Sequence, residues 1–387
     1  MRIILVMQEP PLPFGSAPAR WYYILLKTLV VRGYDVKAFA TCSKIEDIPK
    51  VEAIFPAPEY NLRCYPSPTE SGWKEKLQTL YRPYSRIFNP QLYQDLDIEL
   101  KKDFDILHLE QLWCGWLGLK YINKALLNVH HLILIDQEHI KSETLHSYIQ
   151  KQMMFSSERR LIQKYKYFRS CSPRLVDKIH KFNPNAKVET IPVGLDLNQY
   201  TYIPNEQRTT EPIISLIGNM SWYPGFSAAE RLLTRLWPAI KQQVPNGQLQ
   251  IVGWSAKSAL SQYINLPDVT IEENVKNIQP YFERTSVFLY APARGSGMKI
   301  KILEALAFGI PVVTTSEGSE GLPAEDGVHA AICDEDEGLI SRTVKLLKNP
   351  ELQNQQRLQG RKMLERHCNS QVTVDAIEKI YHNMLNI

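Results

Sequence analysis

The chain twice repeats the same order of short β-rich runs and longer helical stretches, and this alternation limits the folds it can adopt. The first series begins with an apolar run over 3–7 and a helical stretch over 20–31 that ends at Gly33. Further strands are predicted at 36–40, 106–109, 132–135, 167–171 and 188–191. Strands separated by helices form parallel sheets, because a parallel connection must return to the same end of the sheet. The pattern therefore predicts an α/β protein.

A polar stretch over 198–212, with two prolines and no periodicity, indicates a linker. After it the alternation restarts. Strands are predicted at 213–217, 249–252, 287–290, 311–315 and 330–333, and helices at 228–244, 298–308 and from 337 onward. We therefore expect two Rossmann-like, doubly wound domains that face each other across a cleft, one over 1–200 and one over 201–370.

Composition excludes several classes of protein. The 45 basic and 41 acidic residues leave a formal charge of +4, which is too small for a dedicated nucleic-acid-binding protein. No apolar run approaches the roughly 18 residues that a membrane-spanning helix needs, and the N-terminal run is too short for a signal peptide. The six cysteines are scattered without a CxxC pair, so neither a disulfide framework nor a zinc site is expected. A cytoplasmic protein is predicted.

One segment departs from this scheme. Residues 73–93 mix lysines and arginines with aromatic and aliphatic residues, as interfacial membrane segments do. The alternative is a helical insertion that covers the core of the N-terminal domain, because Pro83 and Pro90 interrupt any long helix. The first interpretation predicts peripheral contact with the inner face of a membrane.

The most informative stretch is 291–315. A predicted strand leads into the turn Gly295-Ser296-Gly297, which opens a helix. Free N–H groups and a partial positive charge at a helix N-terminus suit a phosphate, and glycines allow the backbone to approach closely. Three cationic side chains lie nearby in sequence: Arg294, Lys299 and Lys301.

Glu304 is the only carboxylate between Ser286 and Ser316. Its helix is apolar on nearly every side and should be buried, so the carboxylate needs hydrogen-bond donors. A ribose diol would supply two hydroxyl groups. An ion pair with Lys301, three residues earlier on the same helix, is the other interpretation.

The segment GSGMKIKILEALAFGIPVVTT resembles the donor site of retaining GT-B glycosyltransferases of group 1, also called family 4. It is most similar to the branch in which a glycine-rich turn runs into KILEA. Other segments resemble the family in the same order along the chain: MRIILVM, PPLP, RWYYILLKTLVVRGYDV, DFDILHLEQLW, LILIDQEH, IPVGLDLNQY, LIGNMSWYPGFSAAERLL and EGLPAEDGVHAAIC. This collinear order is more specific than any single motif.

The resemblance implies that the C-terminal domain binds a nucleoside-diphosphate sugar and that a glycan or lipid-linked acceptor enters from the N-terminal domain. It implies no metal and no cofactor, and a last helix over 371–387 that crosses back to the N-terminal domain. The catalytic residues would be His139, beside the transferred sugar, and Lys299, on the diphosphate. The donor site would comprise Gly218, Asn219, Arg294, Gly295, Ser296, Gly297, Met298, Lys299, Lys301 and Glu304, and the acceptor side Gly15, Ser16, Arg20, His108 and Glu110.

The chain departs from the family pattern at four places. Ser296 replaces the first glutamate of an E-x7-E pair, and Ser16-Ala17 replaces a glycine pair in the first loop. Val193 replaces an asparagine at the hinge entry. The basic phosphate grip after the first strand of the donor domain is missing around 219–225.

Other functions are compatible with parts of the sequence. The D-x-D pattern in 334–337 could indicate a metal, but helix capping and first-turn acids explain it better. A dehydrogenase is disfavoured, because no GxGxxG follows Met7. A sugar-nucleotide 2-epimerase and a non-catalytic sugar-nucleotide-binding subunit stay open. The favoured prediction is a glycosyltransferase in the assembly of polysaccharide or glycoconjugate.

Overall fold

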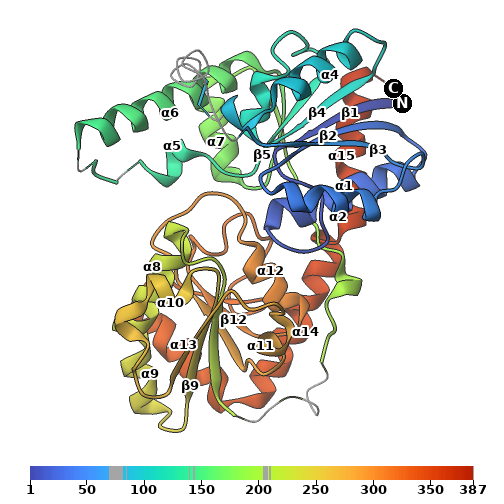
Figure 1. Cartoon of the computed structure of the whole chain (residues 1–387). Coiled ribbons are helices and arrows are strands. Elements are labelled where there is room, and N and C mark those ends of the chain that lie inside the picture. The colour runs from blue at the N-terminus through green and yellow to red at the C-terminus, as the bar shows by residue number, and fades with distance from the viewer. Residues whose placement is uncertain are drawn as a thin grey trace. The chain divides into compact units, whose positions relative to one another are not determined.

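The computed structural model describes residues 1–68, 82–83, 85–138, 140–142, 144–203, 208 and 211–386. The chain folds into two compact units (Figure 1). Unit 1 contains residues 1–194 together with 370–387, and unit 2 contains residues 195–369. The chain therefore leaves the first unit after Gly194 and re-enters it at Ser370.

Unit 1 is built on a seven-stranded sheet with the order β3-β2-β1-β4-β5-β6-β7, in which every neighbouring pair is parallel. Its strands are β1 (Arg2–Met7), β2 (Asp35–Cys42), β3 (Asn61–Pro66), β4 (Ile106–Glu110), β5 (Ala125–Val129), β6 (Tyr167–Ser170) and β7 (Lys187–Thr190). Its α-helices are α1 (Ala17–Val31), α2 (Ile48–Ile54), α4 (Pro90–Leu100), α5 (Ile133–Asp136), α6 (Leu145–Lys164), α7 (Pro173–Phe182) and α15 (Ser370–Leu385). Short 3₁₀ helices include η2 (Ser85–Ile87) and η3 (Leu112–Trp116).

The core of unit 1 lies around the central strands of its sheet. β4 and β5 are buried along their whole length, as expected for a parallel sheet that is covered on both faces. Helix α1 begins at a serine cap, Ser16, whose hydroxyl accepts the N–H of Ala19. Helix α15 packs against α1, where Arg32 pairs with Asp375 and Glu378, so the last helix belongs to the N-terminal unit.

Unit 2 has a six-stranded parallel sheet with the order β10-β9-β8-β11-β12-β13. Its strands are β8 (Ile213–Ile217), β9 (Gln248–Gly253), β10 (Val269–Glu273), β11 (Val287–Tyr290), β12 (Val312–Thr314) and β13 (Ala331–Ile332). Its helices are α8 (Tyr223–Arg231), a π-helical turn (Leu232–Leu236), α9 (Trp237–Gln243), α10 (Ala256–Ala259), α11 (Gln279–Glu283), α12 (Ile300–Ala307), α13 (Asp336–Lys348) and α14 (Pro350–His367). A 3₁₀ turn, η4 (Leu197–Gln199), lies at its start.

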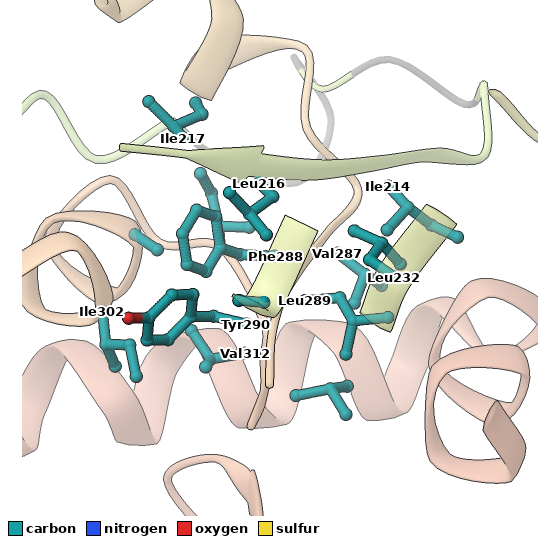
Figure 2. Close-up of a cluster of buried hydrophobic side chains, with 14 of the residues drawn as sticks. Ile214, Leu216, Ile217, Leu232, Val287, Phe288, Leu289, Tyr290, Ile302 and Val312 are labelled. Carbon is teal, nitrogen blue, oxygen red and sulfur yellow. The ribbon is translucent and has the colours of Figure 1, made fainter. Parts of the chain in front are cut away.

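The core of unit 2 lies around β8 and β11. Figure 2 shows Leu216 of β8 and Phe288 of β11 packed together, with Ile302 of α12 beside Tyr290. All four side chains have at most 1% of their surface exposed. This packing holds α12 against the carboxyl end of β11.

The structure confirms an α/β fold with two doubly wound sheets and corrects one strand. Residues 132–135, predicted as a strand, lie in and next to helix α5, and the strand of that region is β5. The edge strands β3 and β10 were not predicted. Of the proposed membrane segment 73–93, residues 73–81 and 84 lie outside the described residues.

Candidate functional site

The strand order reverses between β8 and β11, and this point organises the candidate site. The order of unit 2 is that of a doubly wound sheet, in which the chain leaves β8 and β11 toward opposite edges. Ligands of such sheets bind at the carboxyl ends of the strands where the order reverses. Gly218 follows β8, and the loop over 291–299 follows β11 and leads into α12.

The side chain of Lys301 lies at this reversal point. Its Nζ atom is 4.3 Å from the centre of the Tyr290 ring, and a Cβ atom on Gly218 would come within 2.7 Å of it. Glycine at 218 is therefore what gives the ammonium its space. Burial lowers the pKa of Lys301 to about 8; the positive charge of Lys299 acts in the same direction and Glu304 opposes it.

No hydrogen bond or ion pair is recorded for Lys301 Nζ in the part of unit 2 that the structure describes; its contact is the ring face. The predicted alternative, an ion pair between Lys301 and Glu304, is accordingly not seen among these residues. A half-buried ammonium with its donors available is suited to an anion.

Lys299 has a different role from the direct phosphate contact that was expected. Its Nζ donates to the carbonyl oxygens of Gly295 at 2.7 Å and Gly297 at 2.5 Å, and lies 3.7 Å from a carboxylate oxygen of Glu320. The side chain is 9% exposed. Lys299 therefore cross-links the backbone of the loop over 291–299, here called the glycine loop, and stabilises its conformation.

Two carboxylates that the sequence analysis did not identify lie close to the glycine loop, residues 291–299. Glu317 accepts the backbone N–H of Gly295 at 2.6 Å, and Glu320 faces Lys299. Both follow β12, whose carboxyl end lies at the same edge of the sheet as that of β11. That shared edge is the signal that could have found them.

Glu304 lies on α12 with 5% of its surface exposed. Its Oε1 atom accepts a hydrogen bond from the Tyr200 hydroxyl at 3.3 Å. Helix α12 begins after Lys299, whose own side chain makes no capping hydrogen bond. The carboxylate and the helix N-terminus thus come from the same short helix as Lys301.

The other predicted donor residues lie around the same loop. Gly295 has a φ of +155°, and a Cβ atom there would meet the Pro224 ring at 2.6 Å, so the close approach requires glycine. Asn219 is exposed and turned back on its own loop, where its Oδ1 atom accepts the Ser221 N–H at 2.9 Å. Half-buried side chains complete the loop at Arg294, Ser296 and Met298.

In unit 1, His108 and Glu110 have no exposed surface, which is contrary to the expected acceptor contact. The Glu110 carboxylate accepts from Trp21 at 3.1 Å and Asn128 at 2.7 Å. It also contacts the imidazoles of His108 at 3.0 Å and His130 at 2.8 Å. Because four protein side chains surround this carboxylate, we infer that Glu110 has a structural role at the end of β4.

This buried network reaches the last helix. The Nδ1 atom of His108 is hydrogen-bonded to the Tyr381 hydroxyl of α15. Burial acts to raise the pKa of Glu110, but the hydrogen bonds from His108 and His130 bring that pKa well below its ordinary value. The network therefore joins the sheet of unit 1 to α15.

We expect Tyr381→Phe to lower the free energy of unfolding by about 1–2 kcal/mol, because a buried imidazole nitrogen loses its partner. Chemical denaturation of the full chain measures this change. Tyr23→Phe is the matched control, since the Tyr23 hydroxyl pairs with Lys27 at the surface. Equal effects of the two substitutions would contradict the role given to the network.

The remaining acceptor-side residues are partly placed. Gly15 is exposed with a φ of +91°, Ser16 caps α1 and donates to Glu9, and Arg20 is half-buried in the first turns of α1. His139 lies outside the described residues.

The acidic run 334–337 is engaged by protein partners. Asp336 pairs with Arg231 at 2.7 Å and Arg235 at 2.5 Å, and Asp334 accepts the Ser316 N–H at 2.8 Å. Within the described ranges, no group of three or more His, Cys, Asp or Glu side chains is arranged to hold a metal ion. No described helix combines the length and the apolar character needed to cross a bilayer.

Comparison with known proteins connects this site to one family. Residues 211–349 match the sequence profile of the family described as "Glycosyl transferases group 1". These residues include the glycine loop, Lys301 and Glu304. A curated relative from Haemophilus influenzae, described as an uncharacterized glycosyltransferase, is 25% identical over 179 residues, or 43% of this chain. The match spans about half (49%) of the length of that relative.

Solved structures share the fold over the whole chain. Sucrose-phosphate synthase from Thermosynechococcus elongatus has a TM-score of 0.74 at 15% identity, covering 100% of this chain and 99% of that one. HepE of Anabaena, solved in complex with UDP and glucose, has a TM-score of 0.69 at 12% identity, covering 98% and 99%. At these identities the likeness establishes the fold.

Proposed function

We propose that the chain is a retaining glycosyltransferase, because residues 211–349 match the profile of the family described as "Glycosyl transferases group 1". It transfers a sugar from a nucleoside-diphosphate sugar to a glycan, a lipid-linked molecule or another glycoconjugate acceptor. The reaction needs no metal, because cationic side chains and backbone N–H groups neutralise the diphosphate. The cytoplasmic location and the membrane contact of 73–93 stay predictions.

The observation that carries the proposal is the Lys301 ammonium at the reversal point of the unit 2 sheet. It lies between Tyr290 and Gly218, in the first turn of α12. A diphosphate there would meet a cation and the N-terminal N–H groups of α12 together.

Each donor-site residue then has a distinct part in the reaction. Departure of the diphosphate builds up negative charge, and Lys301 stabilises that charge. Lys299 keeps the glycine loop in shape through its two carbonyl contacts. Glu304 accepts hydrogen bonds from the ribose hydroxyls. The departing phosphate oxygen takes the proton of the acceptor hydroxyl, and His139 orients the sugar.

The ligands of HepE support the donor class. That protein was solved with UDP and glucose, which are the parts of a nucleoside-diphosphate sugar. We extend this class to the present chain because its own site offers a cation for the diphosphate and a carboxylate for the ribose.

A ligand panel tests the proposal. Nucleoside diphosphates and their sugars should raise the melting temperature of the full chain, because a ligand that binds only the folded state stabilises it. Donor hydrolysis by the stabilising sugars should then be detectable. Binding without turnover, even with acceptor glycans, would favour a non-catalytic subunit. Interconversion of the sugar would favour a 2-epimerase.

The pKa of Lys301 makes donor binding depend on pH. With a pKa of about 8, Lys301 is charged below pH 8 and becomes neutral above it, so the affinity for inorganic pyrophosphate should fall as the pH rises through that value. Titration calorimetry across this range measures the change. A flat profile in the wild-type chain would contradict the lowered pKa, and an unchanged pyrophosphate affinity in Lys301→Met would exclude Lys301 as the phosphate-binding cation.

A further inference from the structure

A groove in unit 1 lies far along the sequence from the donor-site residues. It has a volume of about 330 Å³ and is lined by Arg82, Trp116, Leu119, Arg160, Gln163 and Lys164. Three of the six lining residues are cationic and none is acidic. Such a composition favours an anionic ligand.

Helix α6 supplies one wall of the groove. Arg160, Gln163 and Lys164 are spaced so that they share one face of its last turns. The other wall comes from η3 and the residue Leu119 that follows it.

Two guanidinium groups lie over the ring of Trp116. The Arg82 and Arg160 guanidinium carbons are each 5.8 Å from the centre of this ring. Cations at this distance are attracted to the ring face, which holds two like charges near one apolar surface. Trp116 is 8% exposed, and its indole N–H has no hydrogen-bond partner among the described residues.

Packing fixes the walls of the groove. The Tyr165 hydroxyl donates to the carbonyl oxygen of Gly115 at 2.6 Å, which ties η3 to the end of α6. A Cβ atom on Gly115 would approach Leu161 to 3.1 Å, so the two elements are in close contact. Arg160, Lys164 and the indole are therefore presented by two elements that are packed together.

We propose that this groove binds the phosphate group of an amphiphile, with Arg82, Arg160 and Lys164 around the phosphate and Trp116 and Leu119 against its apolar part. Paired guanidinium groups match phosphate geometry. The apolar side chains favour a ligand that carries a hydrocarbon portion over a bare anion. The proposal is independent of the donor site in unit 2.

Binding of decyl phosphate to the full chain tests the proposal, with decyl maltoside as the neutral ligand of equal chain length and inorganic phosphate as the bare anion. We expect decyl phosphate to bind more tightly than either. Arg82→Gln and Arg160→Gln should each weaken this binding about tenfold, as the loss of a charged hydrogen-bonding partner does. Arg160→Lys should retain part of the affinity.

Arg159→Gln is the matched control, because Arg159 is the neighbouring arginine of α6 and stacks on Phe182 at 4.8 Å, outside the groove. It should leave the affinity unchanged. Melting temperatures and nucleoside-diphosphate binding of all variants identify any that fail to fold. Equal binding of decyl maltoside, or an equal loss in Arg159→Gln, would overturn the proposal.

Vesicle flotation distinguishes two sources of the phosphate. Vesicles of phosphatidylcholine with phosphatidic acid are compared with phosphatidylcholine alone. Binding to the acidic vesicles that is lost in Arg160→Gln identifies a lipid headgroup. Binding of monomeric decyl phosphate alone, with the same dependence on Arg160, identifies a dispersed phosphorylated amphiphile. Both results support the site, and independence from Arg160 in both assays contradicts it.

Discussion

Lys301→Met should lower the rate of sugar transfer about 100-fold to 1,000-fold, which is the usual effect of removing a group that stabilises charge in a transition state. Methionine keeps most of the length and the apolar stem of lysine, so the space between Tyr290 and Gly218 stays filled while the charge and its contact with the ring are lost. Affinity for the nucleoside diphosphate and for inorganic pyrophosphate should fall together.

Steady-state kinetics and calorimetry on the full chain measure these effects. Lys276→Met is the matched control, because Lys276 is an exposed lysine of the same unit. The variant at 301 should also lose the pH dependence of pyrophosphate binding. A rate of sugar transfer in Lys301→Met equal to that of the wild-type chain would contradict the role of Lys301 on which the proposed function rests.

Glu304→Ala should weaken the binding of a nucleoside diphosphate by about 1–3 kcal/mol, or roughly tenfold to a hundredfold in Kd. The carboxylate is 5% exposed and accepts a hydrogen bond from the Tyr200 hydroxyl at 3.3 Å. The two hydroxyl groups of a ribose are the donors that a carboxylate binds well.

Pyrophosphate separates this role from that of Lys301. Because pyrophosphate has no ribose, its affinity should be the same in Glu304→Ala and in the wild-type chain. Tyr200→Phe is the structural control, since it removes the hydroxyl that Glu304 accepts from and keeps the ring. A parallel loss of pyrophosphate binding in Glu304→Ala would mean that the substitution disturbs α12 rather than a ribose contact.

The strands that carry the site could be predicted because they are short apolar runs between helical stretches. Residues 213–217 and 287–290 were predicted with the bounds that the structure gives. Residues 132–135 are equally apolar, yet they form α5 and its entry. Glu158 of α6 accepts the N–H groups of Ile133 and Leu134 at 2.8 and 2.7 Å, and this cap is supplied from 25 residues away. Local patterning contains no trace of such a contact.

The chemistry of the site was predictable only in outline. The residue types around 294–304 indicated a phosphate site, but which lysine faces the ligand depends on the fold of the loop. The Lys299 ammonium donates hydrogen bonds to two carbonyl oxygens of its own loop, whereas the Lys301 ammonium lies over the Tyr290 ring. Similarly, β4 ends in His108 and Glu110 as expected, but both side chains are buried in a network that includes Tyr381 of α15.

The return of α15 to unit 1 has a consequence for how the protein matures. Residues 370–386 leave the ribosome after all of unit 2, yet they supply Tyr381 to His108 and two carboxylates to Arg32. The first unit to be synthesised is therefore the last to be completed, and a nascent chain that stalls before Ser370 lacks the helix that packs against α1.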